Sequence, residues 1–180
     1  MTDTKDPTHP PHLRPEIVSP ALTGLDERAM LAGWLDTHRA VLVHKCTGLS
    51  DAQLRERAVP PSTLCLLGLL RHLSDVEAGW FVAVLAGEEP EPTDWSADED
   101  PDADLDPPPD ATLARTLPAY LAACARSRTI LAGLESLDVV GDLRGQPVSA
   151  RWVLTHMVEE YARHNGHADL LRERLDGATG

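Results

Sequence analysis

Four ionisable side chains near the C-terminal end of the sequence have a spacing that could support metal chemistry. They are His156, Glu160, His164 and His167, separated by four, four and three residues. Residues three and four apart lie on one face of an α-helix, so a helix over 151–175 would place all four in a single row. Neutral imidazole and carboxylate are usual ligands of divalent metals, and two such residues four apart are held one helical turn from each other.

The same helical face carries apolar residues, which indicates that the row points toward a core. These apolar residues are Val153, Met157, Ala168 and Leu171. An ionisable group that is buried without a partner costs free energy, so the row needs compensation. A bound metal ion is one form of compensation. A buried hydrogen-bond network between the histidines and Glu160 is the other, and the pattern alone leaves both open.

A further candidate, His72, lies on the inward face of a second predicted helix, over 62–86. The residues that share this face are Leu69, Val76, Gly79 and Ala83. Gly68, one turn before His72, leaves room for a neighbour or a ligand to approach closely. His72, Glu160 and His164 together would supply two imidazoles and one carboxylate, a common open metal site with free positions for water and substrate.

The elements that must position these residues are predicted to be four main helices. Helical periodicity predicts them over 25–47, 62–86 and 111–137, and from Ser149 as N-cap to just before Gly177. The segment 138–147 is predicted to turn, and strand-like alternation is nearly absent. The sequence therefore predicts an all-α four-helix bundle, and the core of such a bundle is where facing helices assemble metal sites.

Two proline-rich segments stand apart from this pattern. Residues 1–22 contain five prolines and predict an extended N-terminal arm, which leaves 23–176 as a single domain. The segment 88–110 contains six prolines, eleven acidic residues and no basic residue, and it predicts a long irregular crossover between the second and third helices. This one segment accounts for eleven of the 13 net negative charges of the chain.

Composition excludes several classes of function. A net charge of −13 argues against nucleic-acid binding. No run of about 18 apolar residues predicts a membrane span, and no secretory signal is recognisable, so we expect a cytoplasmic protein. The three cysteines, Cys46, Cys65 and Cys124, lie in apolar helical contexts and predict buried reduced thiols rather than a disulfide framework. A catalytic cysteine is the less favoured alternative.

Two segments resemble the DinB-like superfamily of four-helix-bundle metalloproteins. They are LLGLLRHLSDVEAGWF, at Leu66–Phe81, and WVLTHMVEEYARHNGHADLLRE, at Trp152–Glu173. More narrowly, these segments and Leu25–Leu54 resemble the mini-circle-protein branch, which is mostly of unknown function. That branch is related to mycothiol-dependent maleylpyruvate isomerases and bacillithiol transferases. The resemblance covers nearly the whole chain apart from the arm and the acidic segment.

The resemblance implies a metal site on His72, Glu160 and His164. The superfamily places one metal-binding histidine in its second helix and two further ligands, four residues apart, in its last helix. Many members have histidine at both of these last positions, so Glu160 is a departure, and the maleylpyruvate isomerase relatives share it. His156 and His167 would then be groups that face the substrate or support the ligands.

Residues and resemblance together predict a divalent-metal-dependent enzyme, a thiol-dependent S-transferase or isomerase that acts on a small organic electrophile. The metal would be Zn²⁺ or Ni²⁺, with iron as an alternative, and the resemblance implies mycothiol as the co-substrate. The metal would lower the pKa of the thiol, since the thiolate is the nucleophile. His167 or His156 would shuttle a proton. Arg163 would hold a substrate carboxylate, unless it is a surface residue.

Three other functions remain open from the sequence. The same ligands suit a metal-assisted hydrolase, and with Fe(II) they suit an oxygenase. The third alternative is a non-catalytic stress-response binding module whose acidic segment recruits a basic partner. The resemblance also implies a homodimer, because the superfamily commonly packs its bundles in pairs.

Overall fold

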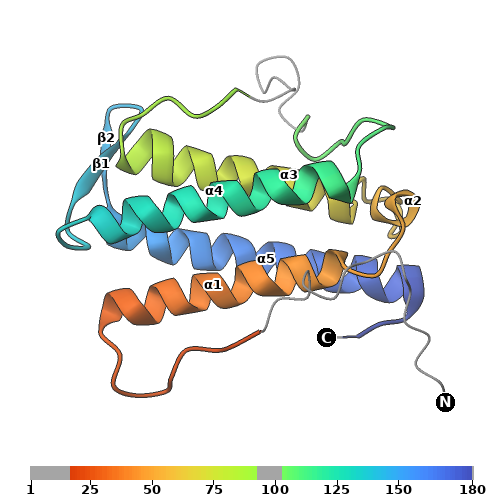
Figure 1. Cartoon of the computed structure of the whole chain (residues 1–180), viewed down its shortest axis with the longest axis horizontal. Coiled ribbons are helices and arrows are strands. Elements are labelled where there is room, and N and C mark those ends of the chain that lie inside the picture. The colour runs from red at the N-terminus through yellow and green to blue at the C-terminus, as the bar shows by residue number, and fades with distance from the viewer. Residues whose placement is uncertain (1–16, 93–102, 180) are drawn as a thin grey trace.

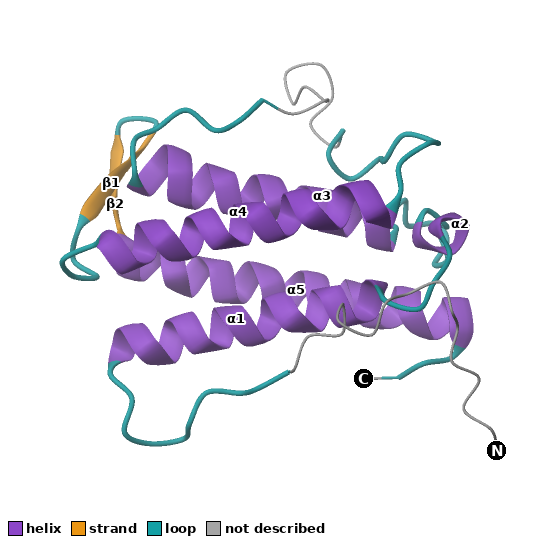
Figure 2. Ribbon diagram, viewed as in Figure 1, coloured by secondary structure: helices purple, strands orange, loops and turns teal. Residues whose placement is uncertain are grey.

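Four long helices form the body of the protein, as the sequence predicts (Figures 1 and 2). The computed structural model describes residues 17–92 and 103–179. The four long helices are α1 (Glu27–Cys46), α3 (Leu66–Glu77) with its continuation η2 (Ala78–Leu85), α4 (Leu113–Gly133) and α5 (Ala150–Asp176). The all-α four-helix bundle is therefore confirmed. None of the described helices is long and apolar enough to cross a membrane.

The direction of the helices explains the long crossover. In Figure 1, α1 and α5 run one way along the bundle, and α3 and α4 both run the other way. Two consecutive parallel helices require the chain to return along the whole bundle before the second can begin. A helix of 21 residues is about 30 Å long, so the return needs at least about nine extended residues. The segment 86–112 makes this return, and its part 93–102 lies outside the described residues.

The first half of the bundle begins and ends its helices at capping residues. Asp26 accepts a hydrogen bond from the Ala29 N–H at the start of α1. Gly48 follows α1 with a φ of 78°, a conformation that glycine adopts without strain. The short helix α2 (Asp51–Leu54) has a capping box at Ser50, where the side chains of Ser50 and Gln53 accept from each other's backbone N–H groups.

The second predicted helix differs from the structure at both ends. It begins at Leu66 instead of Ser62, because 59–62 form a turn through the Ser62 N–H and the Val59 carbonyl, and Cys65 caps the helix instead. Its last two turns are the π-helix η2. A π-helix has more residues per turn than an α-helix, and short π-segments are frequent at functional sites.

The third predicted helix is shorter than expected, spanning Leu113–Gly133, and it tolerates Pro118 in its interior. Its first N–H, at Leu113, is capped by the Asp51 carboxylate of α2 at 2.8 Å. At its other end, Arg28 donates to the carbonyls of Leu131 and Leu134. Contacts from distant parts of the chain therefore satisfy both ends of this helix.

A β-hairpin replaces most of the turn predicted over 138–147. Strands β1 (Val140–Leu143) and β2 (Gln146–Ser149) pair antiparallel, with Val140 opposite Ser149. Arg144 and Gly145, which connect them, both have positive φ, as a two-residue hairpin turn requires. The sequence did not indicate this hairpin, because paired strands of four residues are too short to show a clear alternation.

The start of α5 and the N-terminal segment complete the bundle. Ser149 caps α5 by accepting from the Trp152 N–H, and Gly177 ends it in the left-handed conformation, both as predicted. Of the predicted arm, residues 1–16 lie outside the described residues. Val18, which lies in the described part of the arm, accepts a hydrogen bond at its carbonyl from the Thr37 hydroxyl of α1.

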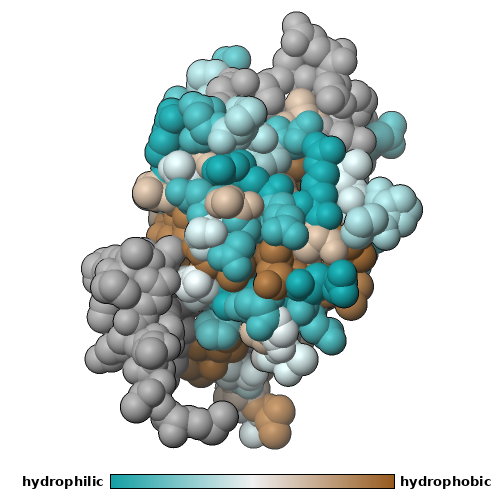
Figure 3. Space-filling model, turned by 90° about the vertical axis from the view of Figure 1, so that its right-hand side faces the viewer, coloured by the Kyte–Doolittle hydropathy of each residue, from teal (hydrophilic) through white to brown (hydrophobic). Residues whose placement is uncertain are grey.

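The end of the molecule turned to the viewer in Figure 3 is mostly hydrophilic, with smaller hydrophobic areas between the hydrophilic ones.

A buried ion pair joins two helices within the core. Glu77, which is 0% exposed, receives hydrogen bonds from Arg39 of α1 at 2.7 and 2.6 Å and from the Tyr161 hydroxyl of α5 at 2.7 Å. The Tyr120 hydroxyl of α4 lies 3.1 Å from that of Tyr161. Burial alone would lower the pKa of Arg39, but the Glu77 carboxylate outweighs it and raises that pKa well above its usual value.

We expect Glu77→Gln to lower the free energy of unfolding by about 3–5 kcal/mol, because it leaves the Arg39 charge buried without its counter-charge. Denaturant titration followed by circular dichroism measures the change. Asp36→Asn is the matched control, because Asp36 also pairs with Arg39 but its side chain is 45% exposed. The control should cost less than about 1 kcal/mol. Equal losses in the two variants would contradict the assignment.

Candidate metal centre

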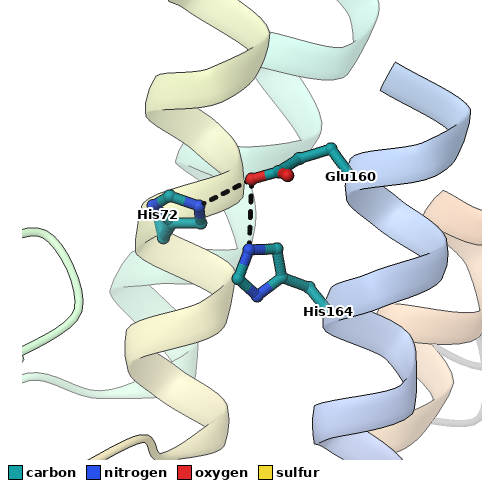
Figure 4. A group of neighbouring side chains, drawn as sticks. All are labelled: His72, Glu160 and His164. Atoms are coloured by element: carbon teal, nitrogen blue, oxygen red, sulfur yellow. Dashed lines mark hydrogen bonds and ion pairs between the residues drawn. The ribbon is translucent and has the colours of Figure 1, made fainter. Parts of the chain in front are cut away.

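The three residues predicted to bind a metal lie together between α3 and α5. His72 comes from α3, and Glu160 and His164 come from successive turns of α5 (Figure 4). One oxygen, Glu160 Oε1, lies 3.2 Å from His72 Nε2 and 3.1 Å from His164 Nε2. Each residue offers one donor atom, and these atoms all lie within 4.8 Å of one another. The inward-facing row predicted from the spacing therefore exists.

The surroundings of these groups favour the protonation states that a metal site needs at two of the three positions. Burial disfavours the Glu160 carboxylate, but its contacts with the His72 and His164 rings outweigh burial and lower the pKa of Glu160. Burial, followed by the charge of His72, lowers the pKa of His164. For His72, burial is outweighed by hydrogen bonds to Asp104 and Glu160, which raise its pKa.

The donor set fits a divalent metal ion. Two imidazole nitrogens and one carboxylate oxygen converge from two rods, and coordination needs the imidazoles neutral and the carboxylate ionised. The side chains are mostly buried, with 19%, 13% and 10% exposure for His72, Glu160 and His164. A hydrogen-bond network without metal would use the same contacts. The geometry is therefore compatible with both interpretations of the sequence pattern, a metal site and a hydrogen-bond network.

Asp104, at the end of the crossover, is a site residue that the sequence did not single out. Its carboxylate Oδ2 lies 2.7 Å from His72 Nδ1, on the side of the ring away from Glu160. The close approach that Gly68 permits is made by this segment: a Cβ at Gly68 would lie 2.1 Å from the Leu105 carbonyl oxygen. Gly68 and the acidic segment were both visible in the sequence. No spacing rule, however, connects Gly68 with Asp104, which follows it by 36 residues.

The three remaining candidates lie on α5 in different surroundings. His167 Nδ1 is 3.4 Å from His164 Nδ1, so it contacts a candidate ligand directly. His156 stacks on Trp152, with ring centroids 5.0 Å apart, and meets the Trp80 ring of η2 edge-on at 4.7 Å. Arg163 is 59% exposed and pairs with Glu159, so the structure places it at the surface.

A cavity of about 730 Å³ lies elsewhere, between α3–η2, α4 and the ends of the crossover. Its lining mixes small apolar residues such as Ala119 and Ala123 with Glu88, Arg115 and Arg126. None of the three candidate ligands lines it. Among the described residues, the donor atoms that converge closely enough to share a metal ion belong to His72, Glu160 and His164, so this cavity is not part of the candidate centre.

Fold and site define a helical bundle of the DinB-like class with a His-Glu-His centre. A crystal structure described as a conserved protein of locus from Enterococcus faecalis superposes with a TM-score of 0.67 over 86% of this chain and 100% of that one, at 16% identity, which shows the fold alone. The model of the Mycothiol-S-transferase family matches residues 30–177, and the chain therefore belongs to that family. No match is found among curated proteins.

We expect the three cysteines to be unreactive in the folded protein, because all three are buried. Burial raises the pKa of Cys46 to about 12 and that of Cys124 to about 11, and it also raises the pKa of Cys65. A chromogenic disulfide reagent at neutral pH should label no thiol rapidly in buffer and all three in denaturant. Rapid labelling of one native thiol would restore the catalytic-cysteine alternative.

Proposed function

We propose that this protein is a divalent-metal-dependent transferase that joins a low-molecular-weight thiol to a small organic electrophile. The observation that carries the proposal is the convergence of His72, Glu160 and His164, with donor atoms within 4.8 Å, in a member of the Mycothiol-S-transferase family. The family name supports mycothiol as the thiol, and the donor set supports Zn²⁺ or Ni²⁺, with iron as the alternative. An isomerase that uses the thiol as a co-substrate is the closest variant of this reaction.

The bound metal would lower the pKa of the thiol and so supply the thiolate nucleophile at neutral pH. Glu160, ionised in these surroundings, would offset part of the positive charge and hold both imidazoles in place. The thiol would lose its proton before the S–C bond forms. As that bond forms, the bond from the attacked carbon to the leaving group of the electrophile would break, and the leaving group would depart with the electron pair. His167, beside His164, is our first candidate to accept that proton, and His156, one helical turn before Glu160, is the second.

The electrophile would lie along the seam between η2 and α5, next to the donors. Trp80, Trp152 and His156 form an aromatic cluster there, and Trp152 is 49% exposed. Such rings would hold the apolar part of a substrate by stacking. Arg163, two turns beyond His156 on the same helix, would hold a substrate carboxylate if it gave up its ion pair with Glu159 for that carboxylate.

A homodimer is also part of the proposal, and analytical ultracentrifugation tests it.

We expect about one divalent metal per chain in protein purified without chelator, and its loss in the His72→Ala, His164→Ala double variant, because one carboxylate alone holds such ions weakly. Elemental analysis measures the metal and identifies Zn, Ni or Fe. His44→Gln, an exposed histidine of α1, is the matched control and should keep its metal. Stoichiometric metal in the double variant would exclude this centre.

We also expect the protein to consume a small organic electrophile, such as an alkylating agent, only when both the metal and added mycothiol are present. Mass spectrometry of the product would show the thiol joined to the electrophile. A panel of amide and ester substrates without thiol is the comparison, and turnover there would favour a metal-assisted hydrolase. Oxygen uptake by the iron-loaded protein would favour an oxygenase. Metal-independent capture of a basic partner, lost on neutralising the acidic segment, would favour a binding module.

A further inference from the structure

We propose that Asp104 is a positioning residue for the metal centre, and that Gly68 is the residue that brings it there. In this proposal the crossover between the second and third long helices is part of the site and not only a connection. Asp104 would hold the proton of His72 on Nδ1, so that the Nε2 lone pair is directed at the metal. The inference rests on the proposed function for its metal, but the arrangement of His72 and Asp104 stands without it.

The two nitrogens of His72 face two different carboxylates. Nδ1 lies 2.7 Å from Asp104 Oδ2, and Nε2 lies 3.2 Å from Glu160 Oε1. An ionised carboxylate only accepts hydrogen bonds, so each contact favours a proton on the nitrogen that it faces. A neutral imidazole has one proton to place. The shorter contact to Asp104 favours Nδ1–H, which is the form that leaves Nε2 free for coordination.

Without Asp104, the remaining carboxylate would favour the opposite form. Glu160 alone would draw the proton to Nε2, which is the atom that must bind the metal. His164 shows the same arrangement with a weaker partner: its Nε2 faces Glu160, and its Nδ1 lies 3.4 Å from His167 Nδ1. Each candidate ligand histidine therefore has a partner at Nδ1, the ring nitrogen that faces away from Glu160. Of these two partners, Asp104 of His72 is the negatively charged one.

The end of the crossover is anchored so that Asp104 has a fixed place. The Leu105 carbonyl packs against Gly68, where any side chain would collide with it. The Arg71 guanidinium donates to the Asp104 carbonyl oxygen at 3.4 Å. Asp106 pairs with Arg57 at 2.7 Å, but both side chains are more than half exposed, and such a surface pair contributes little to this anchoring. The Asp104 side chain is 17% exposed, whereas that of Asp106 is 65% exposed. Asp106 therefore offers a control on the same segment that does not touch the ligands.

The test compares Asp104→Ala with Asp106→Ala, each checked for folding by circular dichroism. Zinc affinity is measured by competition with a chromophoric chelator, and the His72 tautomer by nitrogen-15 NMR on metal-free protein at a pH where the imidazoles are neutral. We expect Asp104→Ala to weaken zinc binding about 10- to 100-fold and to move the His72 proton from Nδ1 to Nε2. Asp104→Asn, which keeps an uncharged acceptor, should recover part of both effects. Asp106→Ala should match the wild type in both measurements.

Gly68→Ala provides a second variant that leaves every ligand and Asp104 in the chain. It should weaken zinc binding in the same direction, because the new Cβ displaces Leu105 and with it Asp104. Wild-type affinity and an unchanged His72 tautomer in Asp104→Ala would overturn the proposal, and wild-type affinity in Gly68→Ala would overturn the role of the glycine. A protein that binds none of zinc, nickel and iron, but in which Asp104→Ala moves the His72 proton, would support the positioning role and refute the proposed function.

Discussion

The buried Glu77 carboxylate is the constraint on which the arrangement of the bundle depends. It joins α3 to Arg39 of α1 and Tyr161 of α5, and Tyr161 contacts Tyr120 of α4, so side chains of all four long helices meet around one charge. A buried charge tolerates little displacement of its partners, because each lost hydrogen bond leaves it less compensated. The network thereby sets how α3 and α5 lie against each other, and these two helices carry the three candidate ligands.

The direction of the helices adds the second constraint. Because α3 and α4 run parallel, the chain must return along the bundle, and the returning segment passes the outer side of His72. Gly68 lets that segment approach the helix closely enough for Asp104 to reach the ring. A connection that topology requires thus supplies a carboxylate to the centre. Most of the negative charge of the chain belongs to the same segment, and Asp104 gives one of those charges a specific contact.

The centre combines a rigid base with a more open side. His72 and His164 are each held at Nδ1 while Nε2 faces Glu160, an arrangement that leaves few alternatives for the two rings. Toward the hairpin end, Trp80, Trp152 and His156 form a surface of aromatic rings along the same seam. In the proposed function, the donors would lie beside an aromatic surface that can stack against the apolar part of an electrophile.

Local sequence determined the four helices, although not all of their bounds, the caps of α5 and the row of candidate ligands, since periodicity and capping depend on residues within one or two turns. Those rules also placed His72 on an inward face and made Gly68 a point of close approach. Only the tertiary structure decided that Asp104 of the acidic segment reaches His72 and that the Glu77 carboxylate is buried. It also decided that His156 contacts two tryptophans while Arg163 stays at the surface. These outcomes depend on how whole helices and the crossover pack, and contacts between residues far apart in the chain leave no periodic signal in it.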